Sequence, residues 1–309
     1  MLSTVPIKCP AYLLEKSGSL GRMRTAVANA GSNLVMERAR FATNKDVIDP
    51  ILIGQAEDIH AIAKHMQWDI SDRNVINART EEIAAETTAQ LARDGEVGAV
   101  MKGHMHTDVF MGALVRSGTG LRTERRITHV CHLTVPESKR VLMITDGAVN
   151  VRPSVDTKMQ IILNSVDLAH ALGNRKPRVA ILSATEKRMP KMRSNIHAVE
   201  LSERAKKELG RQAFVFGPLS FDIAISPEVA RIKGIKHPVA GNADIVVVPD
   251  INSGNALLKM MVYFRSACAA GIVLGAKVPI ILPGRADSPE ASLASAAIAA
   301  ILNLNQKTP

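Results

Sequence analysis

The chain has 309 residues, of which 46% are hydrophobic and only 3% aromatic, so it can bury a core of one large or two ordinary domains and is no small disulfide-stapled fold. The formal net charge of +10 fits an acidic small-molecule substrate, because a basic surface steers anions. Lys and Arg are spread along the chain and few aromatic residues are available for base stacking, so we expect no nucleic-acid partner.

The cysteine positions and the hydropathy of the chain indicate the cellular compartment of the protein. Cys9, Cys131 and Cys268 have no shared spacing, which favours a reducing environment over a disulfide framework or a zinc site. No apolar run approaches the roughly 20 residues of a membrane span. The first residues also lack the pattern of a secretory signal. We therefore expect a cytoplasmic protein with no membrane association.

Helical and strand-like patterns alternate in chain order, which predicts an α/β fold with mostly parallel sheets. The predicted helices are 23–42, 58–66, 80–94, 109–115, 155–172, 196–209, one starting at 226–227, and one ending at 302. The predicted strands are 49–54, 97–101, 127–135, 141–145, 178–182, 214–216, 245–248 and 278–282. Strands 127–135 and 141–145 are expected to be antiparallel because a short turn joins them. The tail 303–309 is expected to be loose.

Residues 237–264 form the most informative stretch. The β-branched run Ile245–Val248 predicts a parallel strand covered on both faces. Asn252, Ser253 and Gly254 then predict a cap and turn before a helix that begins at Asn255. Anions bind at such strand-to-helix loops, because backbone N–H groups point outward there. The alternative to a binding site is an ordinary capped loop. Asp250, Asn252, Ser253 and Asn255 are, however, more polar side chains than one helix cap needs.

Five predicted strands end on small or polar residues, and the carboxyl ends of parallel strands share one edge of a sheet. These ends are 103–108, 146–147, 183–185, 250–255 and 284–288. In the last, Ser288-Pro289-Glu290 predicts a strong helix start. Arg285 beside that start suits a phosphate group, although it could instead pair with Asp287 or Glu290.

Metal and nucleotide motifs are weak or missing. His104 and His106 alone are too few ligands for a tight zinc site, so we expect no metal and a hydrogen-bonding or proton-transfer role for one of them. Gly118-Thr119-Gly120 lacks the third glycine of a dinucleotide fingerprint. No phosphate-binding P-loop or Gly-x-Ser-x-Gly elbow occurs. The chemistry is therefore expected to use dispersed residues that meet in a cleft.

Several of these segments together match the motifs of one family. The matching residues are Lys102–Asp108, Gly217–Leu219 with Asp222, Ile225–Pro227, Pro238–Gly241, Ala243–Ile245, Val248–Asp250, Gly254–Asn255, Lys259 and Arg285–Ser288. From about residue 97 onward, the chain resembles the phosphate acetyltransferase and phosphate butyryltransferase family. The resemblance implies a two-domain α/β/α sandwich like that of isocitrate and isopropylmalate dehydrogenases, with the site in the cleft between the domains. We place one domain at 1–135 plus 275–309 and the other at 136–274.

The resemblance also implies an activity. Family members convert a short-chain acyl-CoA and orthophosphate reversibly into acyl phosphate and CoA by direct transfer, usually as homodimers. Coenzyme A is then a substrate, and no permanent cofactor or metal is implied.

The resemblance suggests roles for particular residues. Arg285 with the helix start at Ser288 would clamp the phosphate, and His106, Thr107 and Ser253 are the candidates for stabilising the oxyanion. Asp287 and Glu290 are the candidates to replace the family's thiol base. The remaining predicted substrate-binding residues are Asp108, Asp250, Asn252, Gly254, Asn255 and Gly284.

The chain departs from the acetyltransferase branch at three positions. Gly284 replaces a serine before the arginine, Ala291 replaces an aspartate six positions after it, and Met111 lies near the place of an expected arginine, for which Arg116 or Arg122 could substitute. The Arg285–Ser288 motif is closer to that of the butyryltransferase branch. Two alternatives remain open. One is a non-catalytic relative that binds CoA or another anion, and the other is a metal-dependent decarboxylating dehydrogenase of the same fold.

Overall fold

The computed structural model describes residues 2–70, 74–116, 118, 120–136, 138, 140–284 and 287–307. The chain divides into two compact units, Ile7–Ile127 with Ala270–Pro309 and Met1–Pro6 with Thr128–Ala269. The domain bounds inferred from the sequence stay a prediction.

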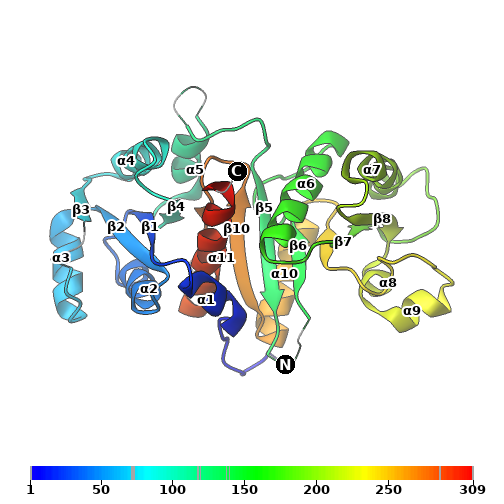
Figure 1. The fold of residues 1–309 in the computed structure, drawn as a ribbon, viewed down its shortest axis with the longest axis horizontal. Helices are drawn as coiled ribbons and strands as arrows, with labels where there is room; N and C mark the ends of the chain where they lie inside the picture. The colour runs from blue at the N-terminus through cyan, green and yellow to red at the C-terminus, as the bar shows by residue number, and fades with distance from the viewer. Residues whose placement is uncertain are drawn as a thin grey trace. The chain divides into compact units, whose positions relative to one another are not determined.

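The unit Ile7–Ile127 with Ala270–Pro309 contains strands in the order β3-β2-β1-β4-β11-β10 (Figure 1). Their bounds are β1 Met23–Ala28, β2 Ile48–Gly54, β3 Asn74–Asn77, β4 Ala99–Lys102, β10 Cys268–Leu274 and β11 Ile280–Ile281. All neighbouring pairs are parallel except β10 with β11. The carboxyl ends of β4 and β11 therefore lie next to each other.

In the described part of this unit, six helices pack around these strands. They are α1 Ala11–Gly18, α2 Asn33–Asn44, α3 Ala56–His65, α4 Glu81–Arg93, α5 Thr107–Val115 and α11 Pro289–Lys307. Helix α11 packs against α1 and α2 and also contacts β4 and β11. Its alanines are buried, Ala294 and Ala297 completely, which allows the neighbouring elements to approach closely.

Two predictions for this unit are wrong. Residues 23–42 form strand β1 and then helix α2, because Ala26 and Val27 pair with β2 and are fully buried, and Ser32 caps the helix by accepting a hydrogen bond from the Val35 N–H. The chain is helical to Lys307, so residues 303–307 are not a loose tail. Residues 308 and 309 lie outside the described part.

The unit Met1–Pro6 with Thr128–Ala269 contains strands in the order β5-β6-β9-β7-β8 (Figure 1). Their bounds are β5 Thr128–Thr134, β6 Leu142–Thr145, β7 Arg178–Leu182, β8 Phe214–Leu219 and β9 Ile245–Val247. Strands β5 and β6 are antiparallel, as predicted, and the β6–β9, β9–β7 and β7–β8 pairs are parallel. The carboxyl ends of β6, β9 and β7 therefore share one edge.

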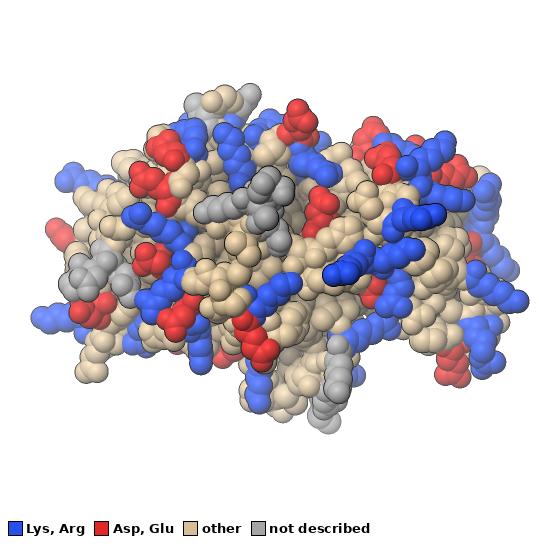
Figure 2. Space-filling model, in the orientation of Figure 1, with Lys and Arg blue, Asp and Glu red and all other residues tan. Residues whose placement is uncertain are grey.

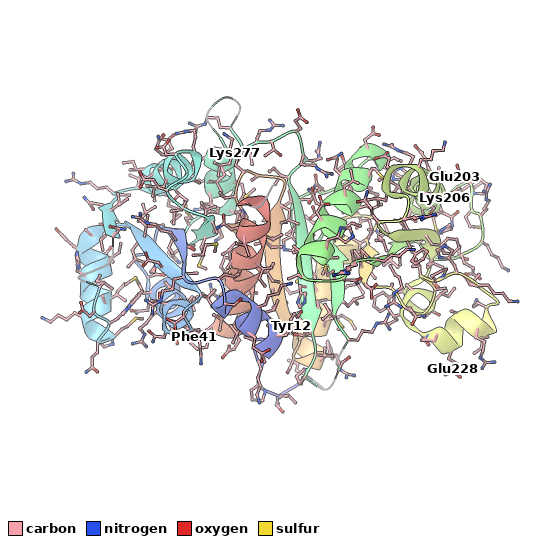
Figure 3. The ribbon with its side chains drawn as sticks, in the orientation of Figure 1. Tyr12, Phe41, Glu203, Lys206, Glu228 and Lys277 are labelled. Carbon is pink, nitrogen blue, oxygen red and sulfur yellow. The ribbon has the colours of Figure 1, made fainter. Side chains whose placement is uncertain are left out.

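The helices of this unit are amphipathic or short. They are α6 Val155–Ala171, α7 Arg193–Leu209, α8 Phe221–Ile225, α9 Pro227–Ile232 and α10 Ile251–Arg265. Helix α7 buries Leu201 and Ala205, while Glu203 and Lys206 lie on its exposed side (Figure 3). Lys and Arg side chains are dispersed among Asp and Glu over the face drawn in Figure 2. Among the described residues, no helix combines the length and apolar character needed to cross a membrane.

Candidate functional site

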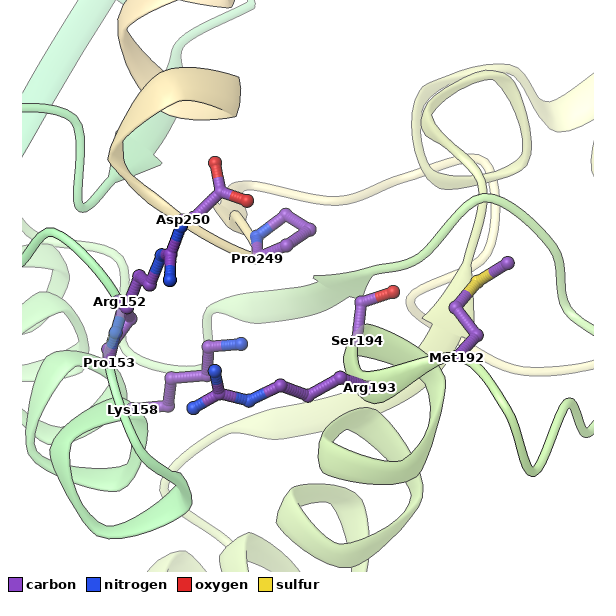
Figure 4. Close-up of a pocket in the computed structure, with 8 residues that line it drawn as sticks. All are labelled: Arg152, Pro153, Lys158, Met192, Arg193, Ser194, Pro249 and Asp250. Atoms are coloured by element: carbon purple, nitrogen blue, oxygen red, sulfur yellow. The ribbon is translucent and has the colours of Figure 1, made fainter.

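A pocket of about 310 Å³ lies in the unit Met1–Pro6 with Thr128–Ala269, among the segments that follow β6, β7 and β9 (Figure 4). Arg152 and Pro153 follow β6, Met192, Arg193 and Ser194 follow β7, and Pro249 and Asp250 follow β9. Lys158 reaches the pocket from the first turn of α6. The shared edge of the three parallel strands therefore brings together residues that are far apart in the sequence.

Three cationic side chains, Arg152, Lys158 and Arg193, point toward this pocket (Figure 4). Lys158 is only 3% exposed. Its Nζ lies 3.4 Å from His197 Nδ1, and Arg193 Nε lies 3.4 Å from His197 Nε2. Burial, with repulsion from Arg193, lowers the pKa of Lys158 to about 8, so the ammonium is still largely charged at neutral pH. Burial also lowers the pKa of His197, which favours its neutral form.

Asp250 caps helix α10. Its Oδ1 accepts hydrogen bonds from the Ser253 N–H at 2.9 Å and from the Ser253 hydroxyl at 3.0 Å. The Ser253 N–H is the largest cause of the lowered pKa of Asp250. The helix therefore begins at Ile251, and the predicted start at Asn255 is wrong because Asp250 supplies the cap. Asn252, Ser253, Gly254 and Asn255 lie within the first turns of the helix.

The first turn of α10 packs on the loop after β6. A Cβ on Gly254 would lie 2.8 Å from Gly147 Cα and 2.9 Å from the Asp146 carbonyl oxygen. Asp146 is 2% exposed and accepts hydrogen bonds from the N–H groups of His129, Ala148 and Val149 and from the Asn150 side-chain amide. The close approach of Gly254 to Gly147 and Asp146 fixes the position of the amino end of α10.

Gly254→Ala is expected to lower the free energy of unfolding by about 1–3 kcal/mol, because the added methyl group must displace backbone. Urea unfolding measures the change. Gly112→Ala in α5 is the matched control, since a Cβ there meets nothing within 4 Å, and it should be neutral or slightly stabilising. An unchanged unfolding midpoint for Gly254→Ala would contradict this reading of the contact.

The other unit carries the predicted residues around His106, after β4. His106 occupies the cap position of α5, and Thr107 and Asp108 are exposed in its first turn. Glu81 Oε2 lies 3.0 Å from His106 Nδ1 and accepts the His106 N–H at 2.9 Å. This contact leaves Nε2 of the exposed imidazole as the nitrogen that can face a substrate.

The segment after β11 is held by buried and capping contacts. The Asp287 carboxylate accepts the Gly284 N–H at 2.7 Å, and Arg38 donates to the carbonyl oxygens of Gly284 and Asp287. The Ser288 hydroxyl accepts the Ala291 N–H at 3.2 Å, as expected for the predicted helix start. Arg285 lies outside the described residues, so its role stays a prediction.

The structure groups the predicted site residues within each unit. Residues 250–255 lie together at the start of α10, whereas His106, Thr107 and Asp108 follow β4, and Gly284, Asp287 and Ser288 follow the adjacent parallel strand β11. Arg152, Lys158 and Arg193 are not among the site residues predicted from the sequence. One signal was available, because Lys158 is the one charged residue on a face of α6 that also carries Ile161 and Ile162, one helical turn further on.

Similar solved structures establish the class of fold. A branched-chain phosphotransacylase from Enterococcus faecalis V583 is 28% identical with a TM-score of 0.79, covering 91% of this chain and 99% of that one. A putative 4-hydroxythreonine-4-phosphate dehydrogenase from Salmonella typhimurium shares the fold at 12% identity, with a TM-score of 0.57 and coverage of 91% and 99%. The predicted fold class, a mainly parallel α/β fold shared with such dehydrogenases, is confirmed.

Sequence comparisons establish the family. The model of the family described as Phosphate acetyl/butaryl transferase matches residues 84–300. A phosphate acetyltransferase of Rickettsia prowazekii (strain Madrid E) is 42% identical over 291 residues, which are 94% of this chain and 83% of the relative. A phosphate butyryltransferase of Clostridium acetobutylicum is 35% identical over 300 residues, 97% of this chain and 100% of the relative. The chain belongs to the phosphate acetyl/butyryl transferase family, which confirms the resemblance.

Proposed function

We propose that the protein converts a short-chain acyl-CoA and orthophosphate reversibly into acyl phosphate and CoA. The observation that carries this proposal is the similarity to both acetyl- and butyryltransferases over more than nine-tenths of the chain. A cytoplasmic location and the lack of a resident cofactor, metal, membrane or nucleic-acid partner stay predictions from the sequence.

The proposed reaction is an acyl transfer without a covalent enzyme intermediate. An orthophosphate oxygen attacks the thioester carbonyl, a C–O bond forms, the C–S bond breaks, and CoA leaves as a thiolate that takes up a proton. The enzyme must then hold the two substrates together, stabilise the oxyanion and manage that proton.

We assign these tasks to the residues inferred from the sequence. Arg285 and the helix start at Ser288 hold the phosphate. The Thr107 hydroxyl donates to the oxyanion together with the Nε2–H of the imidazolium form of His106, whose Nδ1–H faces Glu81. The Ser253 hydroxyl already donates to Asp250, so it would have to rotate to do the same. The Asp287 carboxylate is engaged by the Gly284 N–H. Glu290, in the first turn of α11, is the other candidate for the thiol base.

A thiol-release assay tests the activity. Acetyl-, propionyl- and butyryl-CoA are incubated with the purified protein, with and without orthophosphate. We expect release of free CoA that depends on phosphate and is fastest for one chain length. No release from any of the three would contradict the proposal, and stabilisation by CoA without release would identify a non-catalytic relative.

We also propose that the protein is a homodimer through the outer face of α10. Only Gly254 and Leu258 of this helix are buried, while Met260, Tyr263 and Phe264 are 57%, 46% and 49% exposed. The amino-terminal segment extends this apolar face, because the Ser3 N–H donates to the Tyr263 carbonyl oxygen and Val5 lines a cavity with Phe264. A contiguous exposed apolar face of this kind is typical of a protein–protein interface.

Phe264→Glu is expected to convert the dimer to a monomer, because it buries an unpaired charge in the interface. Light scattering coupled to size-exclusion chromatography measures the mass. Ile232→Glu on α9, where the isoleucine is 68% exposed, is the matched control and should leave the mass unchanged. A wild-type protein that is monomeric at micromolar concentration would contradict the proposed dimer.

A further inference from the structure

The pocket of Figure 4 concentrates positive charge without matching negative charge. Among the described residues, none of Arg152, Lys158 and Arg193 forms an ion pair with a carboxylate. Asp250 is the one acidic residue of the lining, and its Oδ1 already accepts two hydrogen bonds from Ser253. The cations therefore outnumber the anions, and their donors remain available to a ligand.

Without a bound ligand, the charged ammonium group of Lys158 is unfavourable in free energy. An ammonium group loses hydration when it is buried, and a neighbouring cation adds repulsion. Both effects act on Lys158, which is 3% exposed and faces Arg193. His197 lies between the two side chains and supplies no negative charge. Attraction from Asp250 offsets part of these costs. A bound anion would offset more of them, so this buried lysine is better explained as part of a binding site than as part of the core.

The backbone around the pocket reinforces the positive potential. Helices α6, α7 and α10 begin at or beside the lining residues. Met192, at the cap position of α7, provides no side-chain acceptor for the first turn of that helix. The amino ends of helices carry partial positive charge and N–H groups that bind phosphate.

We propose that this pocket binds a dianionic phosphate group, with Lys158 and Arg193 as its main ligands. The apolar walls formed by Pro153, Pro249 and Met192 leave room for an organic group attached to the phosphate. If the protein has the proposed function, Arg285 and Ser288 hold the transferred phosphate, so this group is the 3′-phosphate of coenzyme A; orthophosphate is the other source of the same chemistry, and the titration separates the two. This inference therefore extends the proposed function by assigning a phosphate subsite to residues that the sequence motifs do not include.

Calorimetric titration of the full-length protein tests the pocket. The probes are orthophosphate, coenzyme A and 3′-dephospho-coenzyme A, each titrated into wild type, Lys158→Met and Arg193→Gln. Lys206→Met and Arg211→Gln are the matched controls, because both residues are exposed outside the pocket. Arg193 is also exposed, so its variant remains informative if the buried Lys158→Met variant does not fold.

We expect each pocket variant to weaken one ligand by about 10- to 100-fold, the loss typical of a charge-assisted hydrogen bond, and each control to stay within about twofold of wild type. Weaker orthophosphate binding would identify orthophosphate as the ligand. Weaker CoA binding with unchanged dephospho-CoA binding would identify the 3′-phosphate. Wild-type affinity of both variants for all three probes would overturn the proposal, as would equal weakening of CoA and dephospho-CoA with unchanged orthophosphate binding.

The same preparations separate this proposal from the proposed function. Titration needs no turnover, so a wild-type protein that binds phosphate through Lys158 and releases no thiol would retain the pocket and lose the acyltransferase assignment. Thiol release by wild type, with unchanged ligand affinities in both pocket variants, would support the acyltransferase assignment and overturn the proposed phosphate pocket.

Discussion

Arg285→Ala is expected to lower kcat/KM for orthophosphate by about 10²- to 10³-fold, the range found when one preorganised donor to a developing anion is removed. A guanidinium can bind two phosphate oxygens at once, and alanine offers neither charge nor donor. Arg38 donates to the backbone carbonyl oxygens of Gly284 and Asp287, which the substitution retains. We therefore expect the variant to fold. The thiol-release assay at varied orthophosphate concentration measures the effect.

Two further variants separate charge from geometry at position 285. Arg285→Lys keeps the charge and loses the planar fork, so it should recover only part of the lost activity. Added guanidinium ion at millimolar concentration should partly restore Arg285→Ala, because a free ion can occupy the vacated position. Arg211→Ala, at an exposed site on the other unit, is the control for loss of an arginine. Unchanged phosphate kinetics in Arg285→Ala would remove the arginine from the site.

Asp146→Ala is expected to lower the free energy of unfolding by about 3–5 kcal/mol. The Asp146 carboxylate accepts hydrogen bonds at 3.0, 3.0 and 2.9 Å from the N–H groups of His129, Ala148 and Val149, and at 2.7 Å from the Asn150 amide. Alanine would leave these donors without an acceptor at a site that is 2% exposed. Urea unfolding at constant m-value measures the loss.

Asp156→Ala is the control for this substitution. Asp156 pairs with Arg204 and its side chain is 86% exposed, so its removal should cost less than about 1 kcal/mol. Asp146→Asn keeps one acceptor oxygen but turns an amide toward other donors, and it should be intermediate. A loss below about 1 kcal/mol for Asp146→Ala would show that the loop relaxes and its donors reach water.

Most elements of the fold could be predicted because their patterns are local. The β-branched run at Ile245–Val247, the hairpin of β5 and β6, and the Ser288 helix start all depend on residues within a few positions of one another. The predicted helix over 23–42 failed for the opposite reason. Residues 23–28 suit either a buried helix or a buried strand, and pairing with β2 and β4 decides between them.

The candidate site likewise contains residues that a local sequence pattern identifies and residues that only tertiary contacts bring together. Asp250 and its neighbours were identified because a polar segment after a strand is visible in the sequence, although the helix proved to start earlier. Arg152, Lys158 and Arg193 were not identified, because Arg152 and Lys158 belong to the segment between β6 and the first turn of α6, whereas Arg193 follows β7 about 35 residues later. Nothing in the spacing of residues 152, 158 and 193 shows that the three cations meet.

By itself, the sequence determined the α/β class, most strand and helix positions and the family, since these depend on local pattern and on motifs read along the chain. Only the tertiary structure decided that β6, β9 and β7 lie side by side and bring Lys158, Arg193 and Asp250 to one pocket. The physical reason is that strand order and burial are set by contacts between distant segments. A buried lysine with a pKa of about 8 therefore exists only once those segments have packed around it.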